Sequence, residues 1–125
     1  MADIHFLSLK EFYKLSMIAL GAVPGAFIRW HVSNDFIVNI VGAMVLGFVV
    51  GLPFRRRRYF IFSVGFCGAL TTFSGWMFES AVLFLSGSFI KAFGLIVYTL
   101  GLGLIAAAIG FFIGRHIMSR TKLFL

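Results

Sequence analysis

Charged residues are scarce in this sequence. They make up 12% of its 125 residues, and only four of them are Asp or Glu. Hydrophobic residues make up 61%, and the mean hydropathy is +1.04. A soluble domain of this length needs a more polar surface to remain in water. The composition therefore excludes a soluble domain and predicts an integral membrane protein.

Groups for covalent or enzymatic chemistry are also few. The single cysteine, Cys67, excludes an internal disulfide. The histidines lie outside the apolar runs, at His5, His31 and His116, and Ser74 has no intramembrane His or Lys to activate it as a nucleophile. Glycine-rich nucleotide-binding patterns are absent. The sequence therefore predicts a protein that is not an enzyme.

The sequence does contain four apolar runs separated by charged residues. The runs are 14, 19, 20 and 23 residues long and cover Leu15–Ile28, Phe36–Phe54, Tyr59–Phe78 and Ala92–Gly114. The last three have about the 20 residues needed to cross hydrocarbon, whereas the first needs its flanking Lys14 and Arg29 to reach the interface. A signal peptide is an alternative for the first run. We predict an all-α fold with four transmembrane helices, and residues 1–125 as one transmembrane domain.

The basic residues are placed on one side of this predicted topology. If the runs alternate across the membrane, nine of the eleven Lys and Arg share one side: Lys10, Lys14, Arg55, Arg56, Arg57, Arg58, Arg115, Arg120 and Lys122. The other side has only Arg29 and Lys91. This bias predicts a multi-pass protein of the cell (inner or plasma) membrane with both termini in the cytoplasm. The four consecutive arginines have an alternative interpretation as a nucleic-acid or lipid-headgroup patch.

Small residues recur at helical spacing in three of the runs. The pairs are Gly21 with Gly25, Gly47 with Gly51, and Gly110 with Gly114, and such pairs allow close helix packing in membranes. At 13.9 kDa the bundle is too small to enclose a permeation path by itself, so we expect an oligomer. Asn39 lies four, eight and twelve residues before Ala43, Gly47 and Gly51, on one helix face. Its amide predicts either an interhelical hydrogen bond or a pore-lining role.

The third run contains an unusual stretch, Gly65–Trp76, which reads Gly-Phe-Cys-Gly-Ala-Leu-Thr-Thr-Phe-Ser-Gly-Trp. Glycine frees the backbone, and Thr and Ser offer competing hydrogen bonds, so an unbroken helix is not expected here. Non-helical backbone at membrane depth is typical of an ion or substrate site. Aromatic ring edges at Phe73 and Trp76, with polar groups at Asn39, Thr72 and Ser74, would suit a small anion, although aromatic packing is the alternative.

This stretch, with Glu79 three residues beyond it, resembles the Gly-x-x-Gly-Gly-Leu-Thr-Thr-Phe-Ser-Thr-Phe…Glu signature of the Fluc (CrcB) fluoride channels. Gly25–Trp30 is similar to the family's Gly-x-x-x-Arg-Trp/Tyr, and Asn39–Gly42 to its Asn-Leu-Val-Gly. The resemblance extends from about Ile18 to Gly114 and implies passive export of cytoplasmic fluoride by an antiparallel dual-topology dimer.

The resemblance also implies roles for individual residues. A central structural sodium ion, which is not transported, would be bound by the backbone carbonyls of Gly68 and Thr71. Phe73 matches the family's first pore phenylalanine, and Asn39 its pore asparagine. Arg29 would lie near the aqueous mouth and attract anions.

The chain departs from the family pattern at four positions. Trp76 replaces the second pore phenylalanine, and an ungapped comparison places Leu95, Gly103 and Ala107 at polar pore positions of the fourth helix. Together with the charge bias, these departures predict one half of a pair of non-identical subunits with opposite orientations. A proton-coupled four-helix multidrug exporter and a non-conducting partner subunit remain alternatives.

Overall fold

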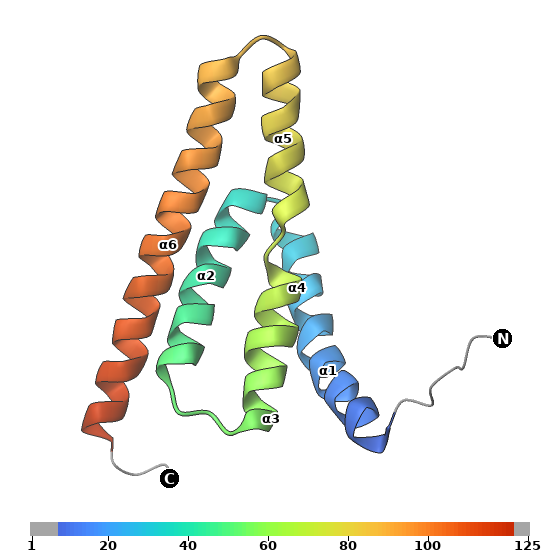
Figure 1. The fold of residues 1–125 in the computed structure, drawn as a ribbon, viewed down its shortest axis with the longest axis vertical. Coiled ribbons are helices and arrows are strands. Elements are labelled where there is room, and N and C mark those ends of the chain that lie inside the picture. Colours follow the sequence, from blue (N-terminus) through green and yellow to red (C-terminus); the bar gives the residue numbers. More distant parts are fainter. Residues whose placement is uncertain (1–7, 122–125) are drawn as a thin grey trace, which may run out of the picture.

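The structure is a computed structural model that describes residues 8–121, and within this range every regular element is a helix (Figure 1). The elements in chain order are α1 (Leu9–Val32), α2 (Asp35–Gly51), α3 (Arg56–Tyr59), the π-helix η1 (Phe60–Cys67), α4 (Gly68–Leu70), α5 (Phe73–Leu85) and α6 (Phe89–Arg120). The all-helical prediction is thus confirmed for this part of the chain.

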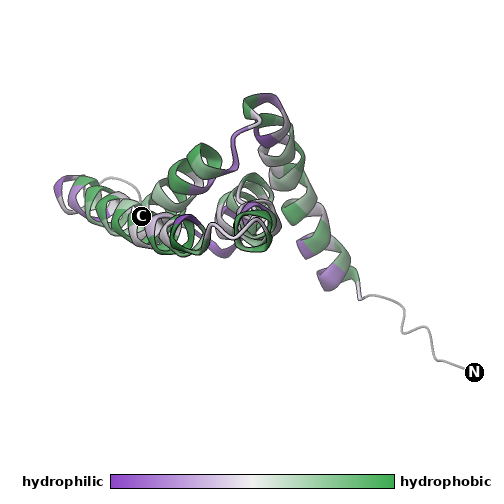
Figure 2. Ribbon diagram, turned by 90° about the horizontal axis from the view of Figure 1, so that it is seen from above, coloured by the Kyte–Doolittle hydropathy of each residue, from purple (hydrophilic) through white to green (hydrophobic). Residues whose placement is uncertain are grey.

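Three helical segments of the described range are long and apolar enough to cross a membrane: Leu9–Val32, Arg56–Leu85 and Phe89–Arg120. The fourth, α2, is apolar but has only 17 residues, or about 26 Å at 1.5 Å per residue. Hydrophobic residues colour much of the long helices in Figure 2. The chain is therefore a multi-pass membrane protein.

Helix α1 is longer than the 14-residue apolar run predicted. It has 24 residues: Ser8 and Glu11 form a capping box at its start, and it ends at Val32, where the following Ser33 has a left-handed backbone. Pro24 lies inside the helix without ending it. Lys14 and Arg29 are thus residues of the helix and not its boundaries.

The α1–η1 contact is made by glycines at backbone distance. A Cβ on Gly21 would overlap the Ile61 carbonyl, and one on Gly65 would overlap the Ile18 carbonyl. These contacts make α1 an integral part of the packed helices, in contrast to the signal-peptide alternative. The predicted role of Gly21 in close packing is confirmed.

Helices α2 and α6 pack in the same way. Gly47 lies against the carbonyl of Ala107, and Gly110 against that of Met44. No side chain separates the two backbones at these points, so the small residue is required by space. The predicted close packing at these two glycines is also confirmed.

The third membrane segment changes its packing partner halfway along its length. Its first half, η1 and α4, packs on α1, whereas its second half, α5, packs on α6. Figure 1 shows that α5 and α6 continue well beyond the turn between α1 and α2. The change of partner falls between Leu70 and Phe73, at the level of that turn.

The basic residues gather at the end of the molecule that lies opposite the turn between α5 and α6. Figure 1 places the start of α1, the α2–α3 connection and the end of α6 at one end. These segments contain Lys10, Lys14, Arg55, Arg56, Arg57, Arg58, Arg115 and Arg120. Lys122 lies outside the described residues, as does His5. The fold therefore brings the described members of the predicted basic side together.

Candidate ion-binding site at the α4–α5 junction

Two residues with extended backbone separate α4 from α5. Thr71 has φ −80° and ψ 151°, and Thr72 has φ −137° and ψ 125°. Gly65 and Gly68, which the sequence predicts to share in the irregular backbone, are helical. The departure from helical geometry is thus confined to the two consecutive threonines, whose β-branched side chains favour extended backbone.

Asn39 of α2 binds both backbone groups of Thr72. The Thr72 N–H donates to Asn39 Oδ1 at 2.7 Å, and Asn39 Nδ2 donates to the Thr72 carbonyl at 2.9 Å. The side-chain amide therefore takes the place of the helical hydrogen bonds that Thr72 lacks. Nδ2 carries a second N–H, so one donor remains available to a ligand. Of the two roles predicted for Asn39, the interhelical hydrogen bond is observed.

The carbonyls of Gly68 and Thr71 lose their usual helical donors at this junction. In a continuous helix the Gly68 carbonyl would accept from the Thr72 N–H, but that group donates to Asn39. The Thr71 carbonyl would accept from the Gly75 N–H, which donates to Thr72 Oγ1 at 3.3 Å. Oxygen ligands of this kind suit a hard cation, so the two carbonyls fit the sodium site implied by the resemblance.

Thr72 and Ser74 place two hydroxyl groups at the start of α5. Thr72 Oγ1 caps α5 by accepting from the Gly75 N–H, and it lies 3.3 Å from Ser74 Oγ. Thr71 Oγ1 instead donates to the Cys67 carbonyl at 2.9 Å. Thr72 and Ser74 therefore form a hydroxyl pair at the start of α5, where unpaired N–H groups favour a negative charge.

The aromatic residues Phe73 and Trp76 contact each other edge to face. Their ring centroids are 5.0 Å apart and their planes meet at 80°. Phe73 is 69% exposed, whereas Trp76 is 5% exposed. Trp76 therefore belongs to the packed interior of this chain, and Phe73 is the ring that can meet a partner subunit or an ion.

Arg29 and Asp35 lie on either side of the α1–α2 turn. Among residues 8–121, no side-chain hydrogen bond or ion pair joins Arg29 to the junction, and its side chain is exposed. The sequence marks Asp35 only as a flanking charge, yet its carboxylate lies directly against Gly75. The signal for this contact is its position four residues before Asn39, on the same helix face.

Helix α6 carries a buried polar group that the sequence comparison missed. Thr99 is 5% exposed, and its hydroxyl has no hydrogen-bond partner within the described residues. It lies midway between Leu95 and Gly103, at the i+4 spacing that also reaches Ala107, so all four share one face. The face of α6 that carries Leu95, Gly103 and Ala107 therefore still contains one polar side chain.

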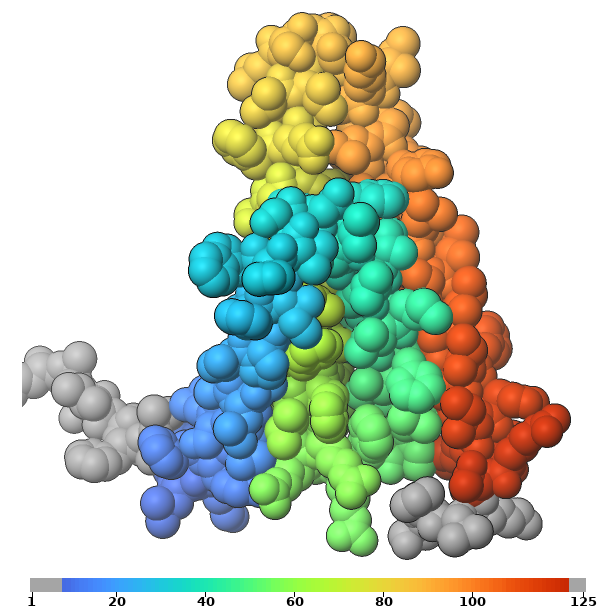
Figure 3. All heavy atoms as spheres, turned by 180° about the vertical axis from the view of Figure 1, so that it is seen from behind, coloured from blue at the N-terminus to red at the C-terminus, as the bar shows by residue number. Residues whose placement is uncertain are grey.

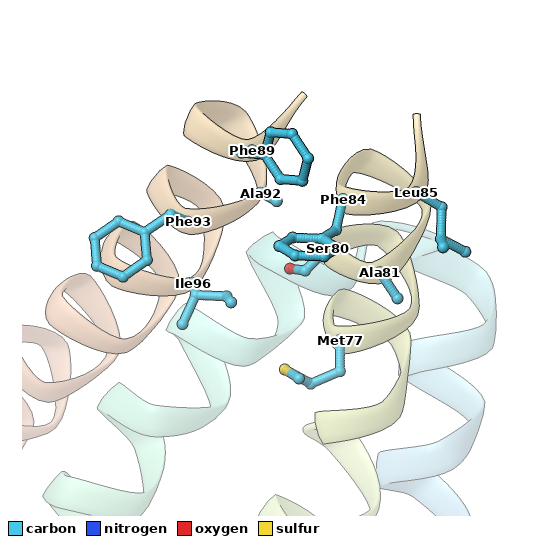
Figure 4. Close-up of a pocket in the computed structure, with 9 residues that line it drawn as sticks. All are labelled: Met77, Ser80, Ala81, Phe84, Leu85, Phe89, Ala92, Phe93 and Ile96. Carbon is cyan, nitrogen blue, oxygen red and sulfur yellow. The ribbon is translucent and has the colours of Figure 1, made fainter. Parts of the chain in front are cut away.

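A cavity of about 630 Å³ between α5 and α6 is not part of this site. Figure 4 shows its lining, which is apolar except for Ser80. The Ser80 hydroxyl donates to the Trp76 carbonyl of its own helix at 2.8 Å. An anion there would meet no free donor, so the cavity does not suit a fluoride path.

The fold and the junction together define a multi-pass helical membrane protein in which two carbonyls without helical donors, two hydroxyls and an amide lie at the α4–α5 junction. The chain belongs to the CrcB family: the family model described as "CrcB-like protein, Camphor Resistance (CrcB)" matches residues 16–111. This membership confirms the family resemblance on which the site residues were predicted.

Several relatives of known name are similar over most of their length. The chain is 54% identical over 105 residues to "Fluoride-specific ion channel FluC 2" of Prochlorococcus marinus (strain MIT 9313), covering 84% of this chain and 85% of the relative. It is 47% identical to FluC 2 of Synechococcus sp. (strain CC9902), covering 86% and 84%. It is 45% identical to FluC 1 of Prochlorococcus marinus (strain SARG), covering 86% and 87%. These names describe ion channels and not enzymes, in agreement with the prediction.

Proposed function

We propose that this protein is a subunit of a fluoride-specific channel through which cytoplasmic fluoride leaves the cell passively. The carrying observation is the Thr71–Thr72 junction, bound by Asn39, in a chain of the CrcB family. The names of its relatives support fluoride as the ion.

Fluoride is strongly hydrated, so a narrow path must replace its water with other donors. Donors of the right kind are the second N–H of Asn39 and the hydroxyls of Thr72 and Ser74. The electropositive edge of the exposed Phe73 ring offers a further contact. Arg29 would raise the local anion concentration at the mouth of the path.

A structural sodium ion is the second part of the proposal. The carbonyls of Gly68 and Thr71 would bind it, and two antiparallel chains would supply four such oxygens at the dimer centre. Bound there, the ion would provide fixed positive charge and hold the two chains together. We expect a higher melting temperature in sodium chloride than in N-methylglucamine chloride at equal ionic strength. Equal melting temperatures would contradict the sodium site.

The partner is proposed to be a related chain of opposite orientation. The one-sided distribution of Lys and Arg disfavours insertion of one sequence in both orientations, and it supports cytoplasmic termini for this chain. Relatives named FluC 1 and FluC 2 both occur, which is in keeping with paired subunits. Leu95, Gly103 and Ala107 would then face polar groups that the partner provides.

Fluoride efflux from liposomes tests these proposals. With a fluoride electrode, we expect this chain alone to release fluoride at about 1% or less of the rate of the co-purified pair, a barrier difference of roughly 2.7 kcal/mol. Full activity of the chain alone would exclude obligatory pairing, but it would still support the proposal that the chain is a fluoride channel. Loss of efflux when a proton gradient is abolished would instead identify a coupled exporter.

A further inference from the structure

We propose that the cleft between the start of α1 and the arginine run binds one anionic phospholipid. The cleft has a volume of about 510 Å³ and lies at the basic end of the molecule. Figure 3 shows the two segments beside each other, the start of α1 in dark blue and the residues near 55–60 in light green. The inference is independent of fluoride conduction.

The walls of the cleft carry four cations from two different elements. Lys10 and Lys14 come from α1, one helical turn apart, and Arg56 and Arg57 come from α3. Within the described range none of the four has an ion-pair or side-chain hydrogen-bond partner. Their convergence therefore leaves a concentrated positive charge without a counter-charge from residues 8–121, and this charge favours binding of an anion.

The nearest acidic residue does not supply that counter-charge. Glu11 lies between the two lysines in sequence, but its carboxylate accepts from the Ser8 N–H at 3.0 Å as part of the capping box. It is not among the residues that line the cleft.

The remaining lining is apolar except for the hydroxyl of Tyr13, and it favours a lipid over a free anion as the ligand. Leu9, Tyr13 and Phe60 complete the cleft, and the Arg56 guanidinium lies 6.0 Å from the centre of the Phe60 ring. Leu9 is 88% exposed, so an acyl chain can reach it. A phosphate between the cations with acyl chains over this apolar floor satisfies both parts of the lining. Basic pockets between helix ends are typical of such headgroup sites.

The arginine run offers a matched pair of variants. Arg56 and Arg57 line the cleft, whereas Arg55 and Arg58 do not. The double variants Arg56→Gln/Arg57→Gln and Arg55→Gln/Arg58→Gln remove the same charge from the same segment. Any effect through membrane topology is therefore equal in the two. Lys10→Gln/Lys14→Gln removes the other wall and serves if the first variant does not fold.

The delipidated full-length protein is titrated with phosphatidylglycerol or phosphatidylcholine and followed by native mass spectrometry. We expect phosphatidylglycerol to bind at least about 10-fold more tightly than phosphatidylcholine. Arg56→Gln/Arg57→Gln should weaken it about 10- to 30-fold, and Arg55→Gln/Arg58→Gln less than about 2-fold. Equal weakening by both double variants would overturn the proposal, because the run would then act only as diffuse charge.

Competition distinguishes the lipid from other anions. Inorganic phosphate and glycerol phosphate at millimolar concentration should displace little phosphatidylglycerol, because they lack acyl chains for the apolar floor. If inorganic phosphate or glycerol phosphate displaced the lipid at concentrations similar to that of the lipid itself, the cleft would be a small-anion site and the lipid proposal would be wrong. Preferential binding of an RNA oligonucleotide that displaces the lipid would likewise contradict it.

Discussion

Replacement of Asn39 by leucine is expected to reduce fluoride efflux of the paired channel by at least about 30-fold. Asn39 satisfies both the N–H and the carbonyl of Thr72, at 2.7 and 2.9 Å. Leucine would leave both groups unpaired in a non-polar setting, at a cost of about 1–3 kcal/mol each. The lower limit for the two groups together is about 2 kcal/mol, which corresponds to the 30-fold loss if this cost raises the barrier to fluoride conduction. Efflux from liposomes measures the effect.

Asn34→Ser is the matched control for this substitution. Asn34 is the N-cap of the same helix and accepts from the Ile37 N–H at 3.0 Å, which a serine hydroxyl can also do without adding a charge. We expect less than about a 2-fold change in efflux from this variant. Thermal unfolding and size-exclusion chromatography establish that each variant is folded. A folded Asn39→Leu channel with normal efflux would refute the role of Asn39 at the junction.

Phe73→Ile should abolish efflux, with a loss of at least about 100-fold, or roughly 2.7 kcal/mol of barrier. Isoleucine fills similar space but has no electropositive ring edge to meet a desolvated anion. The fold should persist because Phe73 is 69% exposed, and only its edge-to-face contact with Trp76, worth about 0.5–1.5 kcal/mol, is lost. Efflux and melting temperature are measured on the same preparation.

Phe78→Ile provides a close control, because Phe78 lies on the same helix and is 73% exposed. It should retain efflux within about 2-fold, since it lies beyond the junction and its loss removes no contact to the ion path. If Phe73→Ile in this chain leaves efflux of the pair unchanged, this chain is a non-conducting partner. If both variants abolish efflux, general aromatic packing is responsible and not a specific ring.

Much of the fold follows from patterns that are visible in the sequence. Apolar runs between charges give the approximate positions of the helices, and the spacing of Gly21, Gly47 and Gly110 predicts which faces pack closely. The first and last residues of the helices were less predictable. Helix α1 continues through Lys14 and Arg29 because its end is determined by a capping box and a left-handed Ser33, which charge counting does not detect.

The site was predictable in part. The polar stretch around Thr71 and Thr72 indicated irregular backbone, but the sequence could not limit it to two residues. That limit depends on Asn39, which is remote in sequence and binds only one residue's backbone. The Asp35 contact with Gly75 was indicated only by the position of Asp35 on the helix face of Asn39. The burial of Thr99 depends on how α6 packs on its neighbours, which no local pattern specifies.

The change of packing partner within the third membrane segment has a mechanical consequence. Backbone contacts at glycines join α1 to η1 and α2 to α6, and α5 packs on α6. A displacement of α5 and α6 relative to α1 and η1 would therefore be absorbed mainly by rotation about the dihedral angles of Thr71 and Thr72, together with the α1–α2 and α2–α3 turns. The residues proposed to meet the ions lie beside these dihedral angles, where a small rotation would change their spacing most directly.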